Sequence, residues 1–292
     1  MDIKALNFSN SKLNNIYYGG SEKKIGVIYQ NENYMIKFQK NTPFGKRYNH
    51  ISEYIGSHIF NMLGIDCQNT ILGRYKGEEV VACKDFLKNG QQFIPFNDVG
   101  ESTLETNKEI YQYSYEDIIS LLEKNAKLTK IKETIENFFD IFIVDALVGN
   151  FDRHGANWGF IKENNSYKLA PVFDNGSCLF PQLTDENEMK DIIQSKEETN
   201  ERVYHFPTSQ IKLKGKKSSY YEVISSLEFD ECNNALIRIY KKIDLNKINE
   251  LINNTPFISE IHKKFYIHII NERFNKIIKY SYEKLVNKNE AN

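Results

Sequence analysis

The 292-residue sequence has few cysteines, no long apolar run and almost no net charge. Its four cysteines form no C-x-x-C pair and show no metal-ligand spacing, which is typical of reduced thiols in a cytosolic protein. No segment reaches the roughly 18 uncharged apolar residues that a membrane-spanning helix needs. Residues 1–7 hold no apolar run of the kind found in signal peptides. We therefore expect a soluble cytoplasmic protein, with secretion as an effector left open.

Other absences disfavour whole classes of function. The formal net charge of −1 argues against direct nucleic-acid binding, because a nucleic-acid-coating protein needs a basic surface. The six histidines form no H-x-x-x-H or H-E-x-x-H pair, so a zinc hydrolase is disfavoured. Neither G-x-G-x-x-G nor a Walker A motif is present, which leaves other phosphate-binding arrangements to be considered.

The first 90 residues predict short strands around one helix. Strands are expected over 25–29, 34–38, 69–75 and 79–86, and apolar spacing predicts a helix over 48–63 that stops at Gly64. Helices dominate the remainder, with expected ranges of 115–123, 130–149, 221–226, 233–243, 245–253 and 258–286. Strands are expected over 158–161 and 167–173, and 184–200 is interpreted as a mobile or partly helical insert. The pattern predicts an α+β, bilobal fold, with an N-lobe over 1–88 and a helical C-lobe over 89–292.

The most informative motif is an ordered set of polar residues between 149 and 176. Asp152 is followed by Asn157 five positions later, and Asp174 lies a further seventeen positions along the chain. Phosphoryl transfer in kinases uses one carboxylate to orient the attacking hydroxyl, and an amide oxygen and a second carboxylate to hold magnesium. We therefore interpret Asp152 as the carboxylate that orients or deprotonates the acceptor hydroxyl, and Asn157 and Asp174 as magnesium ligands. His154 is a candidate to share the catalytic role or to brace the loop.

Upstream residues supply the matching phosphate-binding elements. Lys37 lies in an apolar strand, and Glu53 follows 16 residues later on the predicted helix. In kinases such a lysine contacts the α and β phosphates and pairs with a helix glutamate. Gly19, Gly20 and Ser21 precede the first of these strands, where glycines would let backbone amides approach phosphate closely.

Three further features of the sequence also predict contacts. Lys84, Asp85 and Phe86 end the strand set where the lobes should join, so we expect them to contact the adenine of ATP. Asp145 lies in an otherwise apolar helix, and we expect it to hydrogen-bond the catalytic loop because a buried acid needs partners. The basic run at 212–217 is interpreted as a solvated turn, with docking of an acidic or phosphate-bearing substrate as the alternative.

The chain resembles the HipA-like kinases, specifically the shorter CtkA-like group with a HipA-type C-terminal domain. The resemblance rests on residues 82–86, 150–160 and 170–176 and covers about residues 15 to 280. It implies a protein-kinase-like fold that uses ATP and Mg²⁺ to phosphorylate Ser or Thr in proteins. It also implies the roles given above for Lys37, Asp152, Asn157 and Asp174, and adenine contacts for Lys84 and Phe86.

The chain departs from the family pattern in three ways. The extra N-terminal subdomain of full-length HipA toxins is missing from the pattern, which weakens any inference of an antitoxin partner or of operator binding. In the family a regulatory serine in the glycine-rich loop is autophosphorylated, and only Ser21 is nearby here. Asp174-Asn175-Gly176 replaces Asp-Phe-Gly, so the activation switch of eukaryotic kinases is not expected.

Two alternatives stay open at this point. Asp-Arg-His-x-x-Asn also resembles the catalytic loop of phosphoinositide kinases, so the acceptor could be a lipid or small molecule. A nucleotide-binding pseudokinase is the alternative from another class, although Lys37, Asp152, Asn157 and Asp174 fill all four polar positions.

Overall fold

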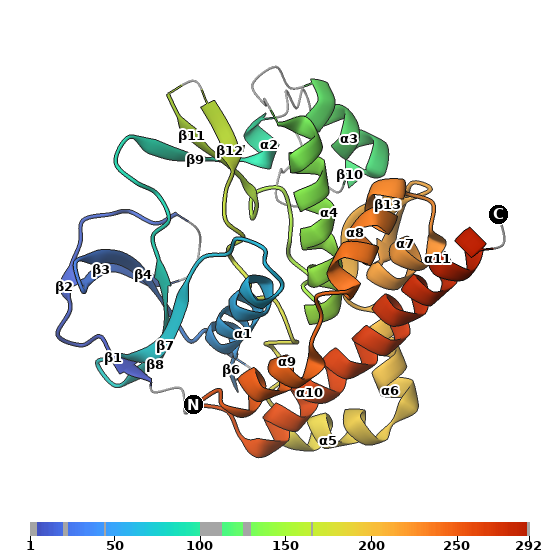
Figure 1. Ribbon diagram of the computed structural model, residues 1–292. Coiled ribbons are helices and arrows are strands. Elements are labelled where there is room, and N and C mark those ends of the chain that lie inside the picture. Colours follow the sequence, from blue (N-terminus) through green and yellow to red (C-terminus); the bar gives the residue numbers. More distant parts are fainter. Residues whose placement is uncertain are drawn as a thin grey trace.

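The computed structural model describes residues 5–19, 23–43, 45–99, 113–124, 130–164 and 166–290. A twisted sheet with one helix forms the N-lobe, and a larger helical body forms the C-lobe (Figure 1). The long helix α4 (Ile131–Val148) runs through the middle of the C-lobe. The bilobal α+β fold predicted from the sequence is confirmed.

The N-lobe is built on a six-stranded sheet with the order β1-β7-β8-β4-β3-β2. Its strands are β1 (Leu6–Asn7), β2 (Lys12–Leu13), β3 (Lys24–Tyr29), β4 (Glu32–Phe38), β7 (Thr70–Tyr75) and β8 (Glu78–Lys84). Two-residue turns with positive φ angles join β3 to β4, at Gln30-Asn31, and β7 to β8, at Lys76-Gly77. Such turns match the twist of the paired strands and fix the register within each of the two hairpins. The two hairpins meet through β4 and β8, where Lys37 lies opposite Val81.

Helix α1 (Asn49–Met62) covers one face of this sheet by packing on β7 and β8. A separate small core, which includes Phe8, Ile36 and Val80, fills the opposite face. Strand β8 is therefore buried on both faces, which explains its unbroken apolar run from Val80 to Cys83. A short hairpin, β5 (Asn41–Thr42) and β6 (Gly45–Lys46), leads into α1.

The C-lobe surrounds α4, most of whose residues are buried. A helix that is apolar on all sides belongs inside a core, and α3, α7, α8 and α10 pack around it. The bounds of the other helices are α2 (Phe96–Val99), α3 (Tyr115–Lys124), α5 (Glu186–Gln194), α6 (Lys196–Asn200), α7 (Tyr220–Ser226), α8 (Asp230–Tyr240), α9 (Leu245–Asn253), α10 (Glu260–Arg273) and α11 (Tyr280–Glu290). Two π-helical segments, η1 (Glu201–His205) and η2 (Phe274–Lys279), continue α6 and α10.

Two small sheets belong to the C-lobe. One has the order β12-β11-β9 and contains β9 (Gln91–Pro95), β11 (Gly159–Glu163) and β12 (Ser166–Leu169). The other has the order β10-β13-β14 and contains β10 (Tyr113–Ser114), β13 (Thr208–Leu213) and β14 (Lys216–Ser219). Because β9 pairs with β11, the chain joins the C-lobe sheet soon after it leaves β8.

The structure corrects one expected strand and refines two other expectations. The strand predicted over 167–173 ends at Leu169, and Val172 makes only an isolated bridge with Cys67. The insert at 184–200 is mostly helical, as α5 and α6, with side-chain caps from Asp185 and Ser195. The basic run at 212–217 lies in the β13–β14 hairpin, with Lys214-Gly215 as its turn. The division of the chain at residues 88 and 89 stays a prediction.

Two further observations concern the molecule as a whole. All four cysteines are free and buried. Within the described residues, no helix is long and apolar enough to cross a membrane.

Candidate active site

Lys37 joins the two lobes through its ammonium group. Its Nζ lies 2.6 Å from Glu53 Oε2, on α1, and 2.8 Å from Asp174 Oδ1, on the loop that follows β12. The second oxygen of Glu53, Oε1, accepts a hydrogen bond from the Asn175 backbone N–H at 2.9 Å. The lysine–glutamate pair expected from a 16-residue spacing is therefore formed, and it is tied directly to the loop that carries Asp174.

Electrostatics keep Lys37 and Asp174 ionised. Burial by itself would lower the pKa of Lys37, but the carboxylates of Asp174 and Glu53 raise it well above its ordinary value. The ammonium of Lys37 in turn lowers the pKa of Asp174 below its usual range. Asp174 has a φ angle of 58°, a left-handed conformation that aspartate tolerates better than most residues. The site is thus preorganised: the Lys37 ammonium can meet negative oxygens of a ligand, and the Asp174 carboxylate can meet a cation.

The catalytic-loop candidates follow the end of α4 directly. Gly149 caps that helix in the left-handed conformation, with φ 63°, and its backbone N–H donates to Asp145 O. Asn150 donates from Nδ2 to Asp145 Oδ1 and accepts on Oδ1 from the Asp152 backbone N–H. Asn157 donates from Nδ2 to Asp152 O at 2.9 Å. These bonds fold residues 150–157 into a tight loop that leaves the Asp152 side chain 47% exposed.

His154 lies inside the same loop. Its Nδ1 accepts a hydrogen bond from the Ala156 backbone N–H at 3.2 Å, and its Nε2 lies 3.8 Å from Asp152 Oδ1. A separation of 3.8 Å is too long for a hydrogen bond. The loop-bracing contact expected for His154 is present, whereas its direct participation in catalysis stays a prediction.

Arg153 was not singled out from the sequence, although it connects the whole site. Its guanidinium donates two bonds to Asp145, at 3.0 and 3.1 Å, and further bonds to Asn157 O, Phe173 O and Asn175 Oδ1. Burial would lower the pKa of Arg153, but the Asp145 carboxylate raises it above its ordinary value. The expectation that Asp145 bonds the catalytic loop is confirmed. A buried acid eight residues before an arginine was the available signal for this pair.

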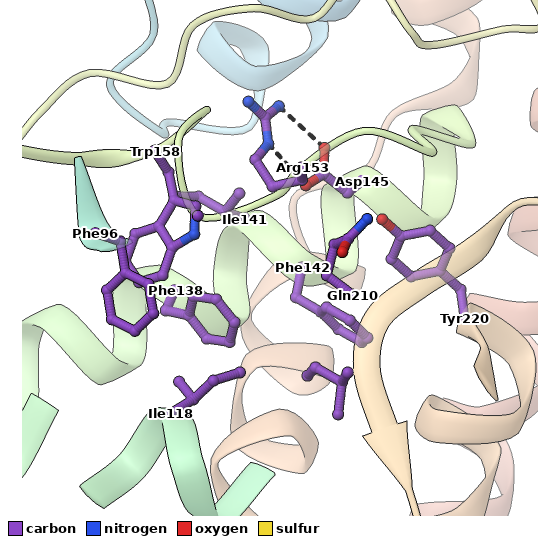
Figure 2. A pocket seen from close by; sticks show the side chains of 12 residues that line it. Phe96, Ile118, Phe138, Ile141, Phe142, Asp145, Arg153, Trp158, Gln210 and Tyr220 are labelled. Atoms are coloured by element: carbon purple, nitrogen blue, oxygen red, sulfur yellow. Dashed lines mark hydrogen bonds and ion pairs between the residues drawn. The ribbon is translucent and has the colours of Figure 1, made fainter. Parts of the chain in front are cut away.

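A small cavity lies behind the catalytic loop, against the pair formed by Asp145 and Arg153. Figure 2 shows that pair at one edge of the cavity, the rings of Phe138 and Trp158 on one wall, and Gln210 near the opposite wall. Its volume of about 30 Å³ has room for only one or two water molecules. We regard it as a packing feature beneath the loop.

The predicted adenine-contact segment begins at Lys84, the last residue of β8, and part of its backbone is already hydrogen-bonded. Lys84 N–H donates to Asn69 O, and Lys84 O accepts from Gln68 Nε2. The Asp85 N–H donates to Asn33 O. These bonds leave the ring of Phe86 as the group in this segment best suited to contact a base.

An aromatic cluster surrounds that ring. Phe86, Phe93 and Phe173 lie with ring centroids 5.0 to 6.4 Å apart, and each is partly exposed. Phe173 directly precedes Asp174, and Phe93 comes from β9. Flat apolar surfaces of this kind can sandwich a purine ring. Phe93 and Phe173 were missed from the sequence because 80 residues of chain separate them.

The glycine-rich segment is described only in part. Gly19 accepts a hydrogen bond from Lys24 Nζ, and the side chain of Tyr18 donates from its hydroxyl to Asp85 Oδ2 at 3.1 Å. Desolvation, followed by the nearby Asp85 carboxylate, raises the pKa of Tyr18 above its ordinary value. This bond links the segment to the end of β8. Gly20 and Ser21, both predicted to contact phosphate, lie outside the described residues.

The oxygens of Asn157 and Asp174 suit a hard cation such as Mg²⁺. The Asn157 amide donates through nitrogen to Asp152 O, so its oxygen is the remaining ligand atom. In Asp174, Oδ1 accepts a hydrogen bond from Lys37 Nζ, and Oδ2 is the second carboxylate oxygen that could bind the ion. Among the described residues, no group of three or more histidines, cysteines or acids could hold a metal alone. This donor set fits a magnesium ion that takes its other ligands from water and from phosphate oxygens.

Comparisons with known proteins agree with this geometry. The model of the HipA-like C-terminal domain matches residues 16–236. The serine/threonine-protein kinase CtkA of Helicobacter pylori is 40% identical over 267 residues, which cover 89% of this chain and 82% of that protein.

Two solved structures extend the comparison. The crystal structure of the H. pylori proinflammatory kinase CtkA superposes with a TM-score of 0.90 at 36% identity, covering 97% of this chain and 98% of that one. HipA from Shewanella oneidensis, solved with HipB and operator DNA, gives a TM-score of 0.59 at 14% identity, over 92% of this chain and 67% of that one. The second likeness concerns the fold alone.

Proposed function

Because this chain belongs to the HipA-like C-terminal domain family, we propose that it is a serine/threonine protein kinase that uses ATP with Mg²⁺. Its 40% identity to a serine/threonine-protein kinase over most of its length supports the protein acceptor. We further propose that the protein phosphorylates itself and that it is located in the cytoplasm.

One observation carries the proposal. The Lys37 ammonium lies within 2.8 Å of both Glu53 and Asp174, while Arg153 holds the metal-loop residue Asn175 and the catalytic loop through the same guanidinium. Phosphate-binding, metal-binding and hydroxyl-orienting groups are thereby fixed relative to one another before substrate arrives. Positioning and electrostatic stabilisation supply most of the catalysis in phosphoryl transfer.

We assign the side chains the following roles within this proposal. Lys37 binds the α and β phosphate oxygens and balances their charge, and Glu53 holds the lysine in place. Asp152, exposed at the loop, accepts a hydrogen bond from the acceptor hydroxyl and aligns it with the γ-phosphorus. The hydroxyl oxygen bonds to that phosphorus, the bond to the β–γ bridging oxygen breaks, and ADP leaves. The hydroxyl proton passes to the Asp152 carboxylate.

Asn157 and Asp174 would hold Mg²⁺ through their side-chain oxygens. The ion would neutralise the charge that develops on the phosphate oxygens. Phe86, together with Phe93 and Phe173, would contact the adenine ring through the aromatic cluster described above.

Intact-mass spectrometry after incubation with Mg·ATP tests the proposal. We expect wild type to gain one or more phosphates and Asp152→Asn to gain none, with ATP binding largely retained in the variant. Asp174→Asn should also weaken the magnesium-dependent part of ATP binding. Asp191→Asn, at an exposed position on α5, serves as the matched control and should behave as wild type.

Each other outcome has a defined meaning. Wild-type turnover in both Asp152→Asn and Asp174→Asn would show that the site is assigned wrongly. ATP consumption with a lipid or small-molecule acceptor alone would replace the protein acceptor. ATP binding without any turnover would leave a pseudokinase.

A further inference from the structure

Three phenylalanine rings of the C-lobe lie together, and one of them belongs to the catalytic loop. The Phe206 ring centroid is 5.9 Å from that of Phe151 and 5.9 Å from that of Phe180. Phe151 directly precedes Asp152 in the chain. Phe206 is 38% exposed, whereas Phe180 is only 4% exposed. We call Phe151, Phe180 and Phe206 the phenylalanine shelf.

The shelf is assembled from three separate segments of the C-lobe. Phe151 comes from the catalytic loop, Phe180 from the chain that follows the metal-binding loop, and Phe206 from the residue after η1. The Phe206 N–H donates to Glu201 O at 2.9 Å. The next residue, Pro207, packs beside Gly149, so that its Cδ would lie 3.6 Å from a Cβ placed there. Phe206 is therefore held against the base of the catalytic loop.

The exposed Phe206 ring packs on buried aromatic rings. Phe180 packs beneath it and contacts Phe265, which is fully buried, at a centroid distance of 6.2 Å. Single exposed apolar residues are common on protein surfaces. Phe206 differs because aromatic contacts fix it against Phe151, the residue that precedes Asp152 in the chain. A rigid, half-exposed aromatic ring at such a place suits recognition of an apolar group at low entropic cost.

The charge near the shelf supports an apolar occupant. Arg202, four residues before Phe206, pairs with Glu198 at 2.7 Å and with Glu188 at 3.4 Å. The Arg202 guanidinium is therefore paired with two glutamates of the 184–200 segment and is not directed at an acidic side chain of a peptide. A charged peptide residue on the shelf would lose water against aromatic rings, which costs free energy.

We propose that the phenylalanine shelf binds a large apolar side chain of the protein substrate, within about three residues of the acceptor Ser or Thr. This inference rests on the proposed kinase function. Phe151 and Asp152 are adjacent residues, whose Cα atoms lie about 3.8 Å apart, and the Phe206 ring centroid lies 5.9 Å from that of Phe151. An extended peptide advances about 3.3 Å per residue. A peptide whose hydroxyl meets Asp152 therefore passes the shelf with residues one to three positions away.

Matched acceptor peptides test the shelf directly. A set of serine peptides would carry Leu, Ala or Asp at each position from three residues before the serine to three residues after it. For the position that meets the shelf, wild type should show kcat/KM about tenfold higher with Leu than with Ala, and lower still with Asp. Phe206→Ala should bring the Leu-to-Ala ratio close to one.

Two further variants separate recognition from folding. Phe206→Leu keeps an apolar surface and should restore most of the Leu-to-Ala ratio. Tyr280→Ala removes another exposed aromatic ring, 45% exposed on α11, and should keep the wild-type ratio. A thermal melt of each variant identifies any that fails to fold, and a change in the ratio is not expected from a general loss of stability.

The outcomes distinguish this inference from the kinase proposal. A wild-type enzyme that incorporates phosphate by intact mass but shows no preference for Leu at any position refutes the shelf alone. Retention of the preference in Phe206→Ala also refutes it. A wild-type enzyme that transfers phosphate neither to itself nor to any peptide refutes the proposed protein kinase and the shelf together.

Discussion

At the scale of single residues, the Arg153 guanidinium links several parts of the candidate site. Its side chain is only 6% exposed, and it bonds Asp145 as well as backbone and side-chain oxygens of both functional loops. Arginine suits this position because its planar fork can donate several bonds in fixed directions at once. Lysine would keep the charge and lose that geometry.

Arg153→Ala should therefore destabilise the protein and impair transfer. Removing one partner of a buried ion pair leaves an uncompensated charge on Asp145, which costs about 3–5 kcal/mol. Urea unfolding would measure this loss. Arg153→Lys should recover part of the stability but little of the phosphotransfer rate. Lys279→Ala, which breaks an exposed pair with Glu283, is the control and should cause no measurable change. Equal behaviour of Arg153→Ala and this control would contradict the role given to Arg153.

Residue types and spacing predicted part of the site but not its connections. Lys37 and Glu53 could be paired because a strand and the next helix place them in a known order, and the structure brings them within 2.6 Å. Phe93 and Phe173 meet only through the pairing of β9 with β11 and the course of the chain after β12. Residues that meet in this way lie far apart in the chain at no characteristic spacing, so a single sequence gives no signal for their contact.

At the scale of elements, the close approach of α1 to the loop that carries Asp174 and Asn175 sets the geometry of the Lys37 pair. Gly56 faces that loop, and a Cβ at this position would lie 2.8 Å from Asn175 Cβ and 3.3 Å from Cys178 Sγ. Both neighbours are buried. Glycine is thus required by the distance between the helix and the loop.

Gly56→Ala should push α1 away from the loop and lengthen the contacts of Glu53 with Lys37 and Asn175. Helix propensity alone would favour alanine by roughly 1 kcal/mol, so any loss must come from the contact. We expect a lower kcat with little change in far-ultraviolet circular dichroism. Met62→Ala, at an exposed position of the same helix, is the control. Wild-type kcat in Gly56→Ala would show that the approach is not limiting.

Long elements were predicted better than short ones. Helix α4 and strands β3, β4, β7 and β8 lie close to their predicted ranges because their apolar patterns are strong. Strands β1, β2 and β10 have two residues each, which is too short for any period to appear. The run at 212–217 was interpreted as a solvated turn, and strands β13 and β14 on either side of that turn were missed because lysines hide the alternation of their buried residues.

At the scale of the whole molecule, Tyr48, the residue that precedes α1, packs against the buried His262 of α10. The rings of Tyr48, His262 and Tyr266 are in contact, with centroids 4.1 and 4.8 Å apart. Burial lowers the pKa of His262 from 6.5 to about 4. Its Nε2 has no hydrogen-bond partner among the described residues. This histidine is held neutral by its surroundings.

The sign of the resulting pH dependence follows from proton binding. Between pH 6.5 and about 4, the unfolded chain binds a proton on His262 that the folded chain does not. The free energy of unfolding should therefore fall by about 2 kcal/mol between pH 7 and pH 5 through this residue. Urea unfolding of His262→Gln should show a shallower fall by that amount. Burial also lowers the pKa of His58 and His268, so some slope will remain.

The exposed His205 provides the comparison. His205→Gln should keep the full wild-type slope. An unchanged slope in His262→Gln would show that this histidine is protonated without cost in the folded state.

The burial of all four cysteines makes the protein suited to distance measurements by labelling. Burial raises the pKa of every one of these thiols, that of Cys232 to about 12, so they stay protonated and inaccessible. A maleimide dye should therefore react only with cysteines introduced at the surface, and no native thiol needs replacement. A pair introduced at Tyr17, which is 90% exposed on the N-lobe, and at Lys190 on α5 would report how far the lobes move when nucleotide binds.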